Sequence, residues 1–93
     1  MAVPGALLEK LARELVSRHV RGELGIGSEV GGLRLVWLAE RGGCAAGALA
    51  RFYSDFPSSL YLFEIREERE GGAPRYRVRI ANFNRRNLVN VVV

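Results

Sequence analysis

Apolar residues recur with helical spacing in the first part of the chain. The residues of this run are Leu8, Leu11, Leu15 and His19, with charged residues between them. Intervals of three and four residues are typical of an amphipathic helix, and Pro4 precedes the run, where proline favours a first helical turn. The pattern predicts a helix over about residues 4–22. A loop is expected after it, because residues 22–32 hold five glycines.

Residues 33–39 have an ambiguous pattern. Leu33, Leu35, Trp37 and Ala39 alternate as in a strand, whereas Leu35, Leu38 and Ala39 fit one side of a helix. The neighbouring segment favours the helix, since its apolar residues lie at i, i+3, i+4, i+7 and i+11. These are Ala45, Ala48, Leu49, Phe52 and Phe56, and Pro57 follows them. We therefore expect two short helices, with an α+β domain in which residues 33–39 form a strand as the alternative.

Two segments rich in aromatic and β-branched residues follow, on either side of Gly71-Gly72-Ala73-Pro74. They predict a β-hairpin with a four-residue loop, in a register that places Glu68 opposite Arg77. One face of this hairpin is apolar and is expected in the core: Tyr61, Phe63, Ile65, Tyr76, Val78 and Ile80. Residues 88–93, Leu-Val-Asn-Val-Val-Val, predict a short last strand or an apolar tail. Trp37 is also expected in the core.

The Gly42-Gly43 break between the two expected helices resembles the turn of a helix-turn-helix. Ala39, Gly43, Leu49 and Phe52 have the spacing of that motif's small, turn and anchoring residues, and Leu35, Leu38, Cys44 and Ala48 add core positions. With the hairpin after it, the chain resembles the winged helix-turn-helix DNA-binding domains. The glycines do not match a phosphate-binding loop, because no Lys-Ser or Lys-Thr follows them.

This resemblance implies an α+β fold of three helices followed by a β-hairpin wing and a short C-terminal strand. Residues 1–93 would form a single domain, with the helix-turn-helix over about 33–56, the wing over about 60–83 and the strand or tail over 88–93. In this family the second motif helix enters the major groove of DNA. That helix would present Arg51 and Ser54. Its other outward residues, Ala46, Gly47 and Ala50, donate no side-chain hydrogen bond, so little direct reading of bases is expected.

The charge of the chain favours an anionic partner. The net charge is +4 and the sequence pI is near 10.0, with most of the excess in residues 60–93. Arg34 and Arg41 flank the first motif helix, and Arg85 and Arg86 have no acid near them in sequence. The wing adds further candidate phosphate contacts: Arg66, Arg69, Arg75, Arg77 and Arg79.

Gly47 would cost about 1 kcal/mol of stability relative to alanine inside a helix, which indicates a packing or approach constraint there.

These residues predict a nucleic-acid-binding protein, binding duplex DNA through phosphate contacts as a small transcriptional regulator or DNA-associated accessory factor. The alternative is a protein-protein interaction module, a small subunit of a larger nucleic-acid-processing complex. An unpaired C-terminal strand would be sticky, so a homodimer or a protein partner is expected there. Arg makes up almost all of the basic residues, and Thr and Gln are absent, which favours a GC-rich genome. The absence of Gln, a thermolabile residue, also favours a thermophilic source.

Catalysis is not expected. His19 is expected to be structural, near the end of the first helix, and Cys44 to be a small apolar residue rather than a nucleophile. No spacing matches a zinc site, so we predict no catalytic residue, no metal, no cofactor and no small-molecule substrate. The first residues do not resemble a signal peptide and no apolar run is long enough to span a membrane, so a cytoplasmic protein is expected.

Overall fold

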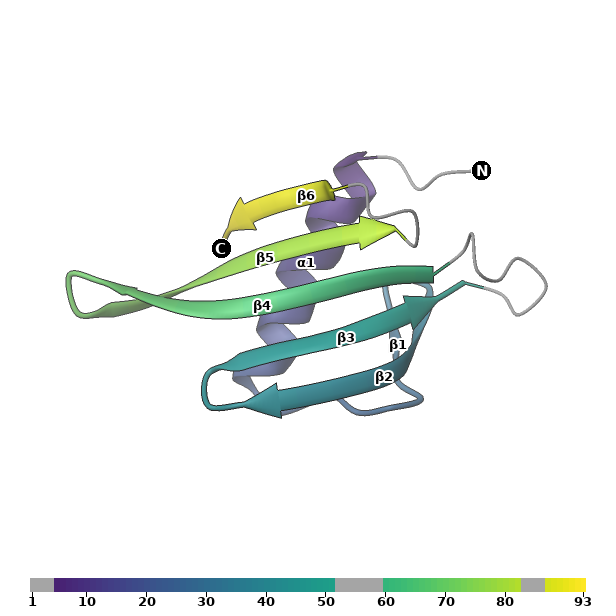
Figure 1. The fold of residues 1–93 in the computed structure, drawn as a ribbon, viewed down its shortest axis with the longest axis horizontal. Helices are drawn as coiled ribbons and strands as arrows, with labels where there is room; N and C mark the ends of the chain where they lie inside the picture. Colours follow the sequence, from purple (N-terminus) through teal and green to yellow (C-terminus); the bar gives the residue numbers. More distant parts are fainter. Residues whose placement is uncertain (1–4, 52–59, 83–86) are drawn as a thin grey trace.

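The computed structural model describes residues 5–51, 60–82 and 87–93, which form one helix and one antiparallel sheet (Figure 1). The helix is α1 (Gly5–Val20). The strands are β1 (Glu29–Val30), β2 (Leu33–Arg41), β3 (Cys44–Ala50), β4 (Leu60–Glu70), β5 (Ala73–Asn82) and β6 (Asn87–Val92). The strands lie in the sheet in the same order as in the sequence.

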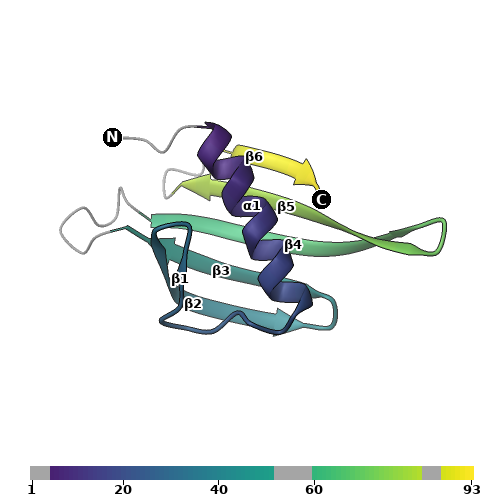
Figure 2. The same ribbon diagram turned by 180° about the vertical axis from the view of Figure 1, so that it is seen from behind.

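Helix α1 covers one face of this sheet. Figure 2 shows the helix crossing in front of the strands, and the sheet curls around it as a half-barrel. The buried residues of the helix form the apolar side that the sequence predicted: Leu8, Leu11, Ala12, Leu15 and Val16. The prediction of a helix over about residues 4–22 is therefore confirmed within the described residues.

The core lies between α1 and the inner face of the sheet. Inward-facing residues alternate along each strand, as a period of two requires. The strands contribute Val30, Leu33, Leu35, Ala45, Leu49, Tyr61, Phe63, Ile65, Val78, Ile80 and Val89. The apolar face predicted for the hairpin is confirmed, because Tyr61, Phe63 and Ile65 are buried in this cluster.

The winged helix-turn-helix prediction is wrong. Residues 33–41 and 44–50 are two paired strands, with Arg41 opposite Cys44 and Leu38 opposite Gly47. The Gly42-Gly43 break is the turn of a β-hairpin. Gly42 takes a φ of 61°, the positive φ that a first central residue needs in a two-residue hairpin turn. Gly43 is small for a different reason, because a β-carbon there would collide with the side chain of Glu67.

A β-bulge hides the strand pattern of β2. Leu35 lies opposite Leu49 and Trp37 lies opposite Ala48, so Val36 is an extra residue in β2. The bulge reverses the alternation, and the inward residues are Leu33 and Leu35 before it but Leu38 after it. The α+β alternative, with residues 33–39 as a strand, therefore describes this segment. Phe52 and Phe56, the last residues of the expected helix, lie outside the described residues.

The hairpin of β4 and β5 exists, but its loop is shorter than predicted. Glu70 lies opposite Ala73, so the turn is Gly71-Gly72, and both glycines have positive φ, 62° and 86°. The register is thereby shifted by two residues from the predicted one, which keeps every side chain on its expected face. Glu68 lies opposite Arg75 but still bonds Arg77, whose Nε donates to Glu68 Oε1 at 2.7 Å.

The last segment is a strand, as one of the two predictions for residues 88–93 required. β6 pairs with β5 and forms one edge of the sheet. Among the described residues there is no helix of the length and apolarity that crossing a membrane would need.

Candidate nucleic-acid interface

The candidate interface is the sheet face that points away from α1, here called the outer face. No described helix or strand crosses it (Figure 1). Alternation places the polar and small residues of β2 to β6 on this side, opposite the core. The outer face therefore meets solvent over the whole width of the sheet.

An apolar row crosses the outer face. Trp37 of β2 lies opposite Ala48 of β3, which lies opposite Leu62 of β4. Trp37 is 53% exposed and Leu62 is 42% exposed, whereas Ala48 between them is 6% exposed. The expectation that Trp37 lies in the core is wrong, because the bulge at Val36 turns its side chain outward. Exposed tryptophan beside other apolar residues is typical of a binding surface.

Two shallow depressions adjoin on this face. The first is lined from β2, β3 and β4 by residues that include Ala39, Arg41, Cys44, Ala46, Glu64 and Arg66. The second is lined by residues that include Ala46, Leu62, Glu64, Arg79, Ala81 and Asn87. Ala46 and Glu64 line both, so the two form one trough with a floor of small side chains. Arg41 lines the first depression and Arg79 lines the second.

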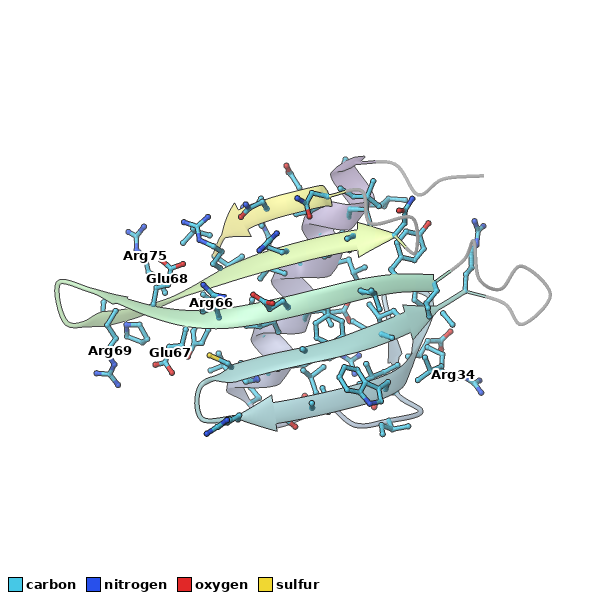
Figure 3. All side chains as sticks on the ribbon, in the orientation of Figure 1. Arg34, Arg66, Glu67, Glu68, Arg69 and Arg75 are labelled. Atoms are coloured by element: carbon cyan, nitrogen blue, oxygen red, sulfur yellow. The ribbon has the colours of Figure 1, made fainter. Side chains whose placement is uncertain are left out.

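Arginines occupy many outer-face positions. By register these are Arg34, Arg41, Arg66, Arg75, Arg77 and Arg79. Two of them are engaged with acids: Arg66 Nη2 lies 3.3 Å from Glu64 Oε1, and Arg77 bonds Glu68. Arg77 also donates to Asn90 Oδ1 at 3.0 Å. Figure 3 shows Arg34 at one end of the sheet, with Arg66, Glu68 and Arg75 toward the β4–β5 turn.

The other four outer-face arginines form no ion pair within the described residues. They are Arg34, Arg41, Arg75 and Arg79. An exposed guanidinium without an acid partner keeps its full charge and all its donors for an external anion.

Positive charge is concentrated on the outer face. Among the side chains that the structure describes, its six arginines face three acids placed there by register, Glu29, Glu64 and Glu68. The helix side is balanced, with the basic residues Lys10, Arg13, Arg18, Arg21 and Arg69 against the acids Glu9, Glu14, Glu23, Glu40 and Glu67. Several of the helix-side charges also pair with each other, as Arg18 and Glu14 do at 3.3 Å.

The structure brings some of the predicted site residues together. Arg34, Arg41, Arg75 and Arg77 all lie on the outer face, although on strands rather than on a motif helix and a wing. Arg51 directly follows β3. Ser54, Arg85 and Arg86 lie outside the described residues. The sequence pattern placed Trp37 in the core and so missed its position on the outer face. Alternation in residues 33–39 could have predicted that position only if the bulge at Val36 had been foreseen.

His19 and Cys44 lie at opposite sides of the β2–β3 hairpin turn: His19 contacts it from α1, and Cys44 begins β3. A carbonyl can only accept a hydrogen bond, so the Nε2–H of His19 donates to the carbonyl of Gly43, at 2.9 Å. This bond joins the end of α1 to the β2–β3 turn. Its ring packs edge-on against Tyr76, with centroids 5.9 Å apart. Cys44 lines the outer-face trough, and no group of three or more potential metal ligands occurs in the described part of the chain.

No family model, curated protein or solved structure matches this chain.

Proposed function

We propose that this protein binds nucleic acid, in the first instance duplex DNA, through phosphate contacts made by the outer face. The observation that carries the proposal is the set of outer-face arginines without an acid partner, against a balanced helix side. Arginine is well suited to phosphate, because its planar donors match two phosphate oxygens at once. An open face with several such groups supports contact with a backbone that carries regularly spaced charges.

The same surface supports binding without sequence reading. The floor of the trough is made of side chains such as Ala39, Ala46 and Ala81, which offer no hydrogen bond to a base edge. The long β4–β5 hairpin has the shape of a ribbon that fits a major groove. Its end, however, combines Arg66, Arg69 and Arg75 with Glu67, Glu68 and Glu70 and carries no net charge. A DNA-associated accessory factor fits these features better than a sequence-specific regulator does.

Salt dependence of binding tests the proposal. We expect labelled duplex DNA to bind in low salt and to dissociate steeply as salt rises, because phosphate contacts release counterions. The double variant R41A/R79A should flatten the slope of log affinity against log salt by about one to two units, since each lost phosphate contact removes about one. The readout is fluorescence anisotropy over a salt series, repeated with single-stranded DNA of the same length.

The matched control removes two charges from the helix side. Lys10 and Arg13 are exposed on α1, so K10A/R13A changes the net charge by the same amount as R41A/R79A. The control should keep the salt slope of the parent protein. Equal slopes in both double variants would show that only net charge matters, and no binding to either DNA in low salt would refute the proposal. A stronger response with single-stranded DNA would assign the face to single strands.

A protein-protein interaction module is the second candidate, favoured by the exposed Trp37 and Leu62 on either side of Ala48. Tryptophan and arginine are the residues most enriched at the centres of protein interfaces. In this case the partner would be held by apolar burial. Its binding would depend on Trp37 and would change little between low and moderate salt, which separates it from phosphate binding.

A further inference from the structure

β6 forms an open edge of the sheet. It pairs with β5 on one side, and no described strand lies on its other side. Its residues, Asn-Leu-Val-Asn-Val-Val, include no charge and no proline. Charged residues and prolines are two of the features by which natural sheets protect an edge from pairing with another chain. Leu88 and Val92 are also exposed, at 38% and 40%. This edge is therefore open to an additional strand.

The backbone groups that face outward can be assigned. Val93 and Tyr76 exchange both of their backbone hydrogen bonds, at 2.8 and 3.2 Å. In an antiparallel pair such residues alternate with ones whose N–H and C=O point away. Val89 and Val91 therefore bond β5, whereas the N–H and C=O groups of Asn90 and Val92 point to the open edge. The inter-strand donors and acceptors for a new strand are in place.

The opposite edge of the sheet differs. β1 covers only the start of β2, where it pairs with Leu33 and Arg34. The rest of β2 is interrupted by the bulge at Val36 and carries Glu40 and Arg41. A bulge and charged residues both discourage strand pairing. β6 has a bulge of its own near its start, where Ile80 lies opposite Val89 but Ala81 lies opposite Asn87, so that Leu88 is the extra residue. From Val89 to Val92 its pairing with β5 is regular, and the strand carries no charged side chain. The two edges are therefore not equivalent, and the regular part of β6 is the less protected one.

The sequence of β6 reads the same in both directions by side-chain type. Around Asn90 lie Val89 and Val91, and beyond them Leu88 and Val92. We propose that a second copy of this chain pairs with β6 in the antiparallel direction, centred on Asn90. A two-fold axis at Asn90 puts this residue opposite itself, Val89 opposite Val91, and Leu88 opposite Val92 of the other copy. An isologous interface requires such self-complementarity.

This pairing buries apolar side chains on both faces. The exposed Leu88 and Val92 of each copy cover those of the other on the solvent side. Asn90 already accepts a hydrogen bond from Arg77 through Oδ1, which leaves its Nδ2 donors for the amide of the other copy. The dimer is a continuous sheet of twelve strands, twice the six of one copy, and it closes, because each copy uses its less protected edge.

Mass against concentration tests the dimer. Sedimentation equilibrium should give twice the chain mass at high concentration. V92K places a charge in the new interface and should raise the dimer dissociation constant at least about tenfold, because a lysine beside Leu88 loses hydration without gaining a partner. N90P removes an N–H that β5 does not use, so it should have the same effect while leaving the β5–β6 ladder intact.

V36K is the matched control. Val36 is 38% exposed on the edge formed by β2, almost as exposed as Val92, so the same substitution there should leave the dimer unchanged. Circular dichroism of each variant checks that the monomer is folded. The proposal is overturned by a monomer at every concentration, by a dimer that V92K and N90P leave intact, or by masses that grow beyond the dimer. It does not depend on DNA binding, which is measured separately.

Discussion

Gly47 lies where neighbouring strands leave no space for a side chain. It lies in β3 directly opposite Phe63 of β4. A β-carbon at this position would lie 2.7 Å from two atoms of the Phe63 ring and 2.5 Å from the backbone oxygen of Trp37. The aromatic ring thus takes the space that a side chain at Gly47 would fill. The packing constraint inferred from sequence exists, although in a strand rather than a helix.

G47A is therefore expected to destabilise the protein. A methyl group there must displace Phe63 or the β2 backbone, and forced overpacking of this kind costs about 1–3 kcal/mol. G25A is the control, because a β-carbon at Gly25 would meet only Ser28 Oγ, at 3.6 Å. It should be neutral or raise stability by up to about 1 kcal/mol. Urea denaturation measures both, and equal stabilities would contradict the close approach at Gly47.

The sequence indicated the exposed arginines of the outer face better than its exposed apolar residues. Arg34, Arg41, Arg75 and Arg77 share the outer face because the strand register places them there, whereas the sequence indicated only that they would meet solvent. Trp37 was misplaced, because its side depends on the parity of the strand, and a single bulge reverses that parity. The exposed apolar surface could not be predicted without knowing where β2 departs from regular pairing.

At the scale of elements, β3 is the segment where sequence pattern and structure disagree. Alanine dominates Cys44–Ala50, and alanine favours helices but fits either structure when it is buried. Ala45 and Leu49 are four residues apart, which suits one side of a helix and also the same face of a strand. Ala48 completed the helical pattern, yet it is buried on the outer face between Trp37 and Leu62. A short run of small residues therefore did not determine its own secondary structure.

The β4–β5 hairpin was easier to predict, because both strands carry long alternating patterns on either side of glycines. Its turn requires positive φ angles, and this requirement can be tested by substitution. Gly72 has a φ of 86°, and no atom lies within 4 Å of a β-carbon added there or at Gly71. Any effect of substitution must then come from the backbone conformation alone, which asparagine tolerates and a β-branched residue does not.

G72V should loosen the end of this hairpin, whereas G71N should not. Valine at positive φ costs about 1–2 kcal/mol, and the turn joins strands that extend beyond the helix, so the strain is relieved by local opening. Amide hydrogen exchange at residues 68–75 should accelerate about tenfold in G72V, as a cost of about 1.4 kcal/mol requires. Similar exchange in both variants would show that the turn does not need positive φ.

At the scale of the whole molecule, the fold is a sheet with one covered face and one open face. The single amphipathic helix was predicted with nearly its observed bounds, because it is long and its period is regular. The number of strands that it covers was not, since the β2–β3 pair was assigned to helices. One apolar helix side can cover a sheet this wide only because the sheet curls around it. The other face then remains open to solvent.

This arrangement predicts that the molecule unfolds as one unit when the packing between α1 and the inner face of the sheet is weakened. Leu15 is 0% exposed in the middle of that packing, and Leu7 on the same helix is 54% exposed. L15A should lower the free energy of unfolding by about 2–5 kcal/mol through lost burial and a cavity, while L7A should stay within about 0.5 kcal/mol of the parent.

Urea unfolding can be followed by two signals, the circular dichroism of the helix and the fluorescence of Trp37. Trp37 is the one tryptophan and lies in β2, far along the sheet from β6. Both signals should move together to lower urea in L15A, because losing the helix exposes the inner face of every strand. If the Trp37 signal kept its midpoint while the helix signal moved, β2 and β3 would be stable without α1, and the core described for this fold would be incorrect.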